Sequence, residues 1–173
     1  KSEDGGETWT HQGLTDSHHI MRIAIDPNDD QTVFVAAMGH NIAPNTERGI
    51  FKTSDGGKTW KKVLFVNDQT GASDVIVDPS NSNHVFAAMW NRNNGSDSGI
   101  YKSVDGGETW KKSTSGFLNG KHTGIIGLDI APTNTNHLYA IVDNRAPNIE
   151  DGEERGVIGC EVYSSLDFGE TWN

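Results

Sequence analysis

The stretch Thr53-Ser54-Asp55-Gly56-Gly57-Lys58-Thr59-Trp60 decides the fold, because three variants of it stand elsewhere in the chain. They occupy residues 2–9, 103–110 and 165–172, so the tryptophans fall at positions 9, 60, 110 and 172. Successive copies are therefore 51, 50 and 62 residues apart. A repeat of about this period is typical of a propeller or a solenoid array. We call each copy an Asp turn.

Two further patterns keep the same period. Ile23-Ala24-Ile25-Asp26-Pro27 returns at residues 75–79 and, with Ala in place of Asp, at residues 128–132. Short β-branched and aromatic runs alternate with Gly, Asn, Asp and Pro, as strands and turns do. The first full unit predicts four strands, at residues 20–25, 33–38, 49–53 and 59–64. Four antiparallel strands per repeat make one propeller blade.

The sequence therefore predicts an all-β fold, a β-propeller segment of about three four-stranded blades. Residues 1–13 end one blade, residues 14–64 and 65–116 form two blades, and residues 117–173 form most of another. Propellers close with about four to eight blades. We therefore expect this chain to be a fragment of a larger propeller. The fragment should fold poorly alone, and its partners should be the remaining blades of the parent propeller.

Each Asp turn has a mechanical explanation. Its Asp can accept backbone N–H bonds from the residues just ahead, its second Gly permits a positive φ, and its Trp buries a large ring beside the turn. This structural role is expected for the twelve residues Asp4, Gly6, Trp9, Asp55, Gly57, Trp60, Asp105, Gly107, Trp110, Asp167, Gly169 and Trp172.

Composition narrows the class of partner. The chain has 173 residues, a formal net charge of −10, and one cysteine, Cys160, so no intrachain disulfide is expected. An acidic surface disfavours nucleic acid and anionic membranes. No apolar run is long enough for a membrane span. Asn94-Gly95-Ser96 matches the glycosylation acceptor pattern, which a three-residue motif meets by chance.

The four Asp turns resemble those of the Asp-box, or BNR, repeat proteins. That group includes sialidases, xyloglucan-type glycoside hydrolases, sortilin-like receptors and a photosystem assembly factor. The resemblance covers the whole chain and is strongest to secreted bacterial proteins with sortilin-type or glycosidase-labelled BNR propellers. It implies an extracellular or cell-surface protein. It assigns no catalytic residues, because none of the five arginines lies in a sialidase arginine motif: Arg22, Arg48, Arg92, Arg145 and Arg155.

Topology gives a second route to a site. The Asp turns join strands three and four, so the opposite end of each blade carries the variable connections, where function concentrates. The strand two-to-three loops are expected at residues 39–48, 91–98 and 143–159, and the inter-blade loops at residues 15–19, 67–73 and 119–123. Trp90 offers a stacking surface for a sugar or peptide ring. The expected ligand-binding residues are His18, His19, His40, Trp90, Arg92, His122, Asn144 and Arg145.

Each of these residues also has a simpler interpretation. His18 and His19 can cap a strand end, and Trp90 can be core. The histidine spacing matches no zinc pattern, and Asp26, Asn28 and Asp30 lack the Gly and Glu of an EF-hand. We therefore expect no metal and no cofactor. The acidic residues between positions 150 and 154 are interpreted as a solvated loop.

Three functions remain open from the sequence. The first is an exported module that binds a protein, a peptide or a glycan through its loop face. The second is part of a glycoside hydrolase, which needs two carboxylates across a groove. Its candidates are Asp16, Asp68 and Asp143. The third is an architectural cell-surface propeller. Binding is preferred, because no catalytic constellation is visible in the sequence.

Overall fold

The computed structural model describes residues 1–93 and 95–173; Asn94, the first residue of the glycosylation pattern, lies outside the described residues. Its regular secondary structure is almost entirely β-strand, and η1 (Thr15–Ser17) is a short 3-10 turn. The first sheet holds β1 (Ile20–Asp26), β2 (Asp29–Ala37), β3 (Gly49–Thr53) and β4 (Lys61–Leu64). The second holds β5 (Thr70–Val77), β6 (Val85–Asn91), β7 (Gly99–Ser103) and β8 (Lys111–Lys112). The third holds β9 (Thr123–Ile130), β10 (Leu138–Glu150) and β11 (Glu153–Ser165).

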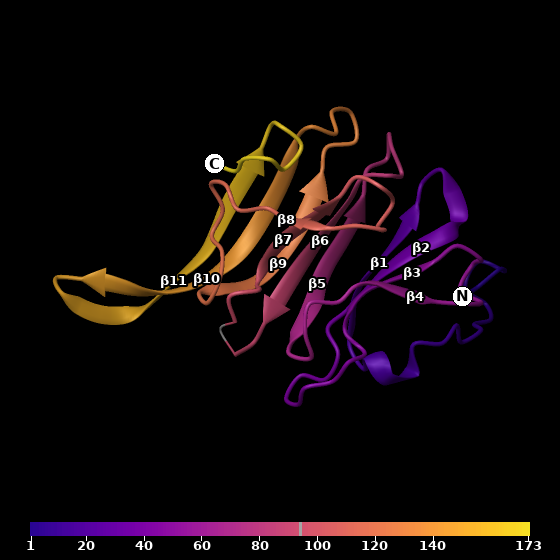
Figure 1. Cartoon of the computed structure of the whole chain (residues 1–173), viewed down its shortest axis with the longest axis horizontal. Coiled ribbons are helices and arrows are strands. Elements are labelled where there is room, and N and C mark those ends of the chain that lie inside the picture. The colour runs from indigo at the N-terminus through magenta and orange to yellow at the C-terminus, as the bar shows by residue number, and fades with distance from the viewer. Residues whose placement is uncertain (94) are drawn as a thin grey trace.

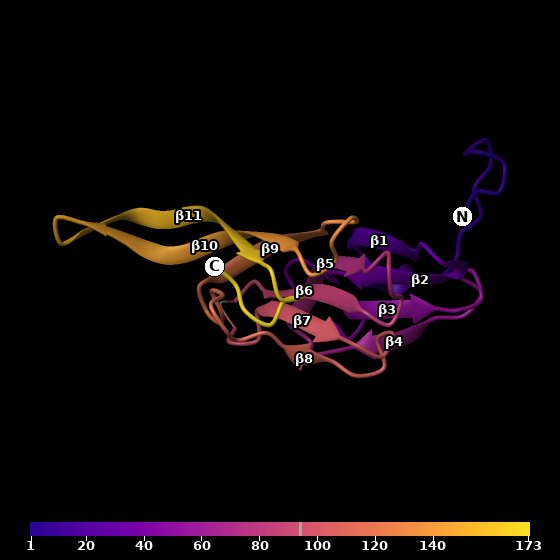
Figure 2. The ribbon, with the colours of Figure 1, turned by 90° about the horizontal axis from the view of Figure 1, so that it is seen from above.

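In each sheet the strands are antiparallel and follow one another in chain order. The three sheets stand side by side, with β1, β5 and β9 along one side and β4 and β8 along the other (Figures 1 and 2). The all-β fold of about three blade-like sheets is therefore confirmed. None of the described helices is long and apolar enough to cross a membrane.

The core lies between the sheets. Phe34, Ala36 and Ile50 of the first sheet pack with Val85 and Met89 of the second. A second cluster joins the second and third sheets, with Phe86, Ala88 and Ile100 packed against Ile126, Leu138 and Val142. In the second sheet, β5 and β6 are buried on both faces, which explains why β6 is a continuous apolar run rather than an alternating one.

The Asp turns share one hydrogen-bond pattern. In the second sheet, Asp105 accepts the backbone N–H of Thr109 at 2.9 Å, and Ser103 Oγ accepts the backbone N–H of Gly107 at 2.8 Å. The bonds to Asp105, led by that from the Thr109 hydroxyl, lower its pKa to about 2. The other three turns make the same bonds, and their aspartates also have lowered pKa values.

The last two Asp turns also cover the preceding sheet. A Cβ at Gly107 would lie 3.0 Å from Cε1 of Phe34, and one at Gly169 would lie 3.0 Å from Cε1 of Phe86. A Cβ at either position would press on the ring, and both glycines also have a positive φ, which side chains other than hydrogen disfavour. These two Asp turns therefore take part in the packing between sheets, whereas in the first Asp turn the ring of Trp9 is 75% exposed, contrary to the expected burial.

The third sheet corrects one expectation. Residues 143–159 are not a loop: β10 and β11 continue as a paired two-stranded ribbon that extends beyond the sheets (Figures 1 and 2). Asp151 and Gly152, with φ of 54° and 80°, form the two-residue turn at its tip. Water reaches both faces of the ribbon, so its sequence lacks the apolar alternation that marks a half-buried strand. The acidic residues between positions 150 and 154 are exposed to solvent, as expected, but they lie at the tip of the ribbon rather than in a loop.

Candidate functional site

The variable connections gather at one end of the sheets, which we call the loop face. Two hydrogen bonds and one stacking contact join neighbouring sheets there. Asn45 N donates to Asp68 O at 3.0 Å, and Arg92 Nη1 donates to Asn41 O at 3.1 Å. The guanidinium of Arg145, on β10, lies 4.9 Å from the ring centroid of Trp90, on β6. The loop face is therefore a continuous surface made by all three sheets.

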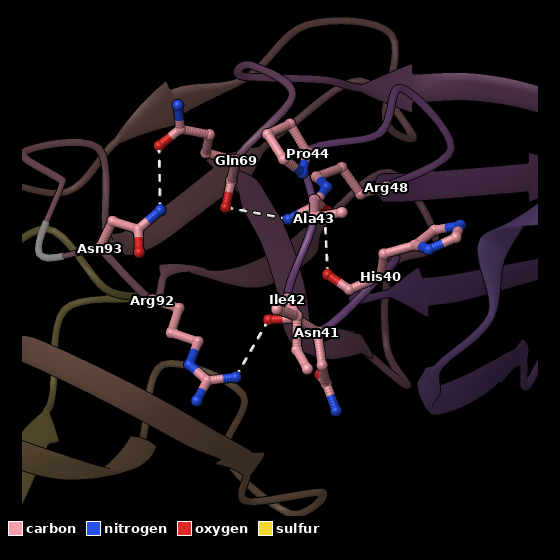
Figure 3. A pocket seen from close by; sticks show the side chains of 9 residues that line it. All are labelled: His40, Asn41, Ile42, Ala43, Pro44, Arg48, Gln69, Arg92 and Asn93. Atoms are coloured by element: carbon pink, nitrogen blue, oxygen red, sulfur yellow. Dashed lines mark hydrogen bonds between the residues drawn. The ribbon is translucent and has the colours of Figure 1, made fainter.

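A pocket of about 170 Å³ opens on the loop face between the first and second sheets (Figure 3). Most of its wall is the β2–β3 connection, and the second sheet adds residues that follow β6. The lining residues are His40, Asn41, Ile42, Ala43, Pro44, Arg48, Gln69, Arg92 and Asn93. Two of them, His40 and Arg92, belong to the expected ligand-binding set.

Arg48 organises this pocket, and sequence reasoning did not select it. Its side chain is almost fully buried, and its guanidinium donates to the carbonyl oxygens of Asn45, Gln69, His40 and Ala43 at 2.9 to 3.0 Å. Burial lowers the pKa of Arg48, and the charge of Asp68 opposes that shift. A possible signal was its place directly before Gly49, at the start of an apolar strand.

Arg92 and Asn93 form the opposite wall. Arg92 is exposed, and the only hydrogen bond it makes within the described residues is the one to Asn41 O. Asn93 Nδ2 donates to Gln69 Oε1 at 3.2 Å. Asn91 Oδ1 accepts the backbone N–H of Asn93 at 2.9 Å, which fixes the turn that carries Arg92.

A second group lies where the loop face meets the ribbon. The guanidinium of Arg145 lies 4.9 Å from the ring centroid of Trp90, and its Nε donates to Asp143 Oδ2 at 2.8 Å. Trp90 Nε1 is buried and has no partner among the described residues. Asn144, also expected to bind ligand, is buried and donates to Glu161 Oε2 at 2.7 Å. It holds the base of the ribbon.

Three of the expected histidines lie near the pocket. The rings of His18 and His40 lie 3.6 Å apart between centroids, and His19 Nδ1 donates to Gly39 O at 3.0 Å. His122 lies apart from them, beside Arg145. Within residues 1–93 and 95–173, no three His, Cys, Asp or Glu side chains are grouped so as to hold a metal ion.

The three candidate carboxylates have different surroundings. Asp16 and Asp68 lie on either side of Asn45, whose Nδ2 donates to Asp16 O at 3.3 Å and whose backbone N–H donates to Asp68 O. Asp143 is instead paired with Arg145.

The fold is similar to several solved propellers. An ancestral GH74 enzyme matches 96% of this chain at 19% identity with a TM-score of 0.69, and the chain covers 20% of that enzyme. The GH74 xyloglucanase from Xanthomonas campestris matches 91% at 15% identity with a TM-score of 0.58, and 23% of it is covered. YCF48 bound to D1 peptide matches 92% at 18% identity with a TM-score of 0.52, and 40% of it is covered. The chain thus spans about a fifth of the GH74 enzymes.

Sequence comparison is more specific. A search of curated proteins gave no match. The family model described as Sortilin, neurotensin receptor 3, matches residues 1–119 and again residues 48–173, which together span the whole chain. The expected resemblance to sortilin-type propellers is thereby confirmed, and this chain belongs to the Sortilin-Vps10 family.

Proposed function

We propose that this chain is part of an exported propeller that binds an acidic peptide segment at its loop face. The observation that carries the proposal is the pocket between the first two sheets, in which the buried Arg48 and the exposed Arg92 stand on opposite walls. The remaining blades of the parent propeller are its expected intramolecular partners, and its proposed location is the cell surface or the extracellular space.

Charge favours an acidic ligand. The chain as a whole carries a formal charge of −10, so a pocket with two arginines differs in sign from most of its surface. Arg48 makes its hydrogen bonds to neutral carbonyl oxygens, which leave its charge uncompensated by direct contact with a carboxylate. A buried cation interacts strongly with an incoming anion because water screens it poorly.

The other lining groups favour a peptide. Asn41, Gln69 and Asn93 carry amides that can both donate to and accept from a peptide backbone. Ile42, which is 92% exposed, and Pro44 offer an apolar surface on which a side chain of the bound peptide can pack. The Trp90–Arg145 stack continues the loop face toward the ribbon. The similarity of the fold to YCF48 bound to D1 peptide supports a peptide ligand.

The test is peptide binding by the natural protein, measured by fluorescence polarisation. The probes are labelled ten-residue peptides of alternating Leu with Glu, Ser or Lys. We expect the Glu peptide to bind best and Arg92→Ala to weaken it about tenfold, the usual effect of losing one hydrogen-bonded charge. The matched control is Arg155→Ala, an exposed arginine at the ribbon tip that pairs with Glu153.

Two outcomes contradict the proposal. One is equal binding of the acidic and basic peptides. The other is an equal effect of Arg92→Ala and Arg155→Ala, since only Arg92 lines the pocket.

Glycoside hydrolysis is a second candidate, because Asn45 holds the segments of both Asp16 and Asp68 at the loop face. Loss of polysaccharide cleavage by the natural protein after Asp16→Asn or Asp68→Asn would support this function. Full retention in both variants would exclude these carboxylates as the catalytic pair.

A further inference from the structure

We infer that a second site, at the opposite end of the sheets from the loop face, binds a neutral saccharide unit. A pocket of about 210 Å³ lies between the Asp turns of the first and second sheets. Water occupies about 30 Å³ per molecule in the liquid, so this space suits a small ligand of roughly seven waters' volume. The lining residues are Lys52, Ser54, Thr59, Trp60, Lys61 and Glu108.

Trp60 supplies a fixed aromatic surface. Its indole Nε1 donates to Gln12 O at 2.6 Å, which holds the ring in one orientation. The ring also packs against the buried cluster of Val35, Ala37 and Phe51 while it lines the pocket. An aromatic ring anchored on one side and open on the other is a surface on which the C–H face of a sugar ring can stack.

The rim supplies hydrogen-bonding groups of both kinds. Lys61 Nζ and Glu108 Oε2 are 2.7 Å apart, and both side chains are more than half exposed, so the pair presents a donor and an acceptor side by side. Ser54 adds an exposed hydroxyl that can both donate and accept, and the exposed Thr59 hydroxyl, which donates to Asp55, can accept. Adjacent donors and acceptors match the vicinal hydroxyl groups of a saccharide.

Both lysines of this pocket already have oxygen partners. Lys61 Nζ pairs with Glu108 Oε2, and Lys52 Nζ donates to Gly106 O at 2.8 Å. Because neither cation is left without a partner, the site favours a neutral ligand over a phosphate or a uronic acid. This distinguishes it from the arginine pocket on the loop face.

The next junction provides an internal comparison. Lys102, Val104, Trp110, Lys111 and Glu170 occupy the equivalent positions between the second and third sheets. There Phe168 replaces Gly106, and Lys102 lies 4.4 Å from the Phe168 ring centroid while its Nζ pairs with Glu170 at 2.7 Å. Val104 also replaces the hydroxyl of Ser54. The polar groups that suit a saccharide are therefore found at the junction of the first and second sheets and not at the junction of the second and third.

The experiment is calorimetric titration of the natural protein with four neutral sugars: cellotetraose, maltotetraose, xylotetraose and chitotetraose. We expect at least one to bind, and Lys61→Met and Glu108→Gln each to weaken it about tenfold, as for a lost hydrogen bond to a charged group. The matched controls are Lys111→Met and Glu170→Gln at the second junction. All four residues are on the surface, so these variants keep the fold.

Arg92→Ala separates the two sites, because it is expected to weaken peptide binding and to leave sugar binding unchanged. The inference is overturned if none of the four sugars binds at millimolar concentration. It is also overturned if the variants at the first and second junctions have equal effects.

Discussion

The carboxylate of Asp74, on β5, accepts a hydrogen bond of 2.8 Å from the backbone N–H of Leu128, on β9. It also accepts the backbone N–H of Val75 at 2.8 Å, and Arg22 Nε on β1 lies 3.9 Å away. Asp74 is 7% exposed. One side chain therefore connects the first strands of all three sheets.

Asp74→Ala is expected to loosen the junction between the second and third sheets. It leaves the Leu128 N–H without its acceptor, and a buried unsatisfied donor costs about 1–3 kcal/mol of unfolding free energy. Urea denaturation followed by tryptophan fluorescence measures the loss. Asp74→Asn keeps an acceptor oxygen and should lose less; an equal loss in both variants would contradict the role of this bond.

The same residue predicts a pH effect. Burial raises the pKa of Asp74 above its ordinary value, and its backbone hydrogen bonds only partly oppose this. The stabilising contribution is therefore complete below the ordinary Asp pKa of about 4 and is lost as pH rises through the folded-state pKa. Asp74→Asn removes this titration, so the difference in unfolding free energy between the variant and the unmodified protein should change in favour of the variant as pH rises from acid to neutral. A constant difference across that range would refute the prediction.

Asp105 predicts the opposite trend. Its pKa is lowered to about 2 by the bonds from Thr109 and Ser103. Its stabilising contribution is therefore complete above the ordinary Asp pKa of about 4 and is lost as pH falls toward 2. Asp105→Asn should lower the melting temperature at neutral pH, and the difference from the unmodified protein should shrink on acidification. The exposed Glu3→Gln serves as the control for a general change in charge.

Gly107→Ala is expected to be more harmful than Gly106→Ala. Both glycines have a positive φ, so both changes strain the backbone to a similar extent. Only the Cβ at residue 107 would press on Phe34, whereas the nearest atom to a Cβ at residue 106 is Lys52 Nζ at 3.6 Å. Overpacking of this kind costs about 1–3 kcal/mol. Equal melting temperatures for the two variants would show that the packing against Phe34 is unimportant.

Arg48→Lys should release the β2–β3 connection while leaving the sheets folded. A lysine ammonium has three donors on a flexible stem and cannot replace the planar fork that reaches four carbonyl oxygens. Hydrogen exchange at residues 40–47 should accelerate while exchange in β6 stays slow, and binding of the Glu peptide should weaken. Unchanged protection of residues 40–47 would contradict the organising role of Arg48.

The strands of the first two sheets were predictable, because their apolar runs repeat with the Asp turns. The ribbon was not, because its exposed faces carry no apolar alternation. The turn signal Asp151-Gly152 was present in the sequence but was interpreted as part of a loop. Arg48 was missed for another reason: its partners are backbone carbonyl oxygens from two connections, and no residue pattern records those contacts. The placement of Arg92 beside His40 likewise follows from how the sheets stack.

The locality of the Asp turns has a consequence for how the chain folds. Their bonds join residues only two or four positions apart, such as Ser103 to Asp105 and Asp105 to Thr109. Each hairpin can therefore close within microseconds, before distant segments meet. Since every strand also pairs with its neighbour in sequence, the sheets need little long-range search. Such a chain is suited to acquiring its structure one sheet at a time, in the order in which the ribosome releases it.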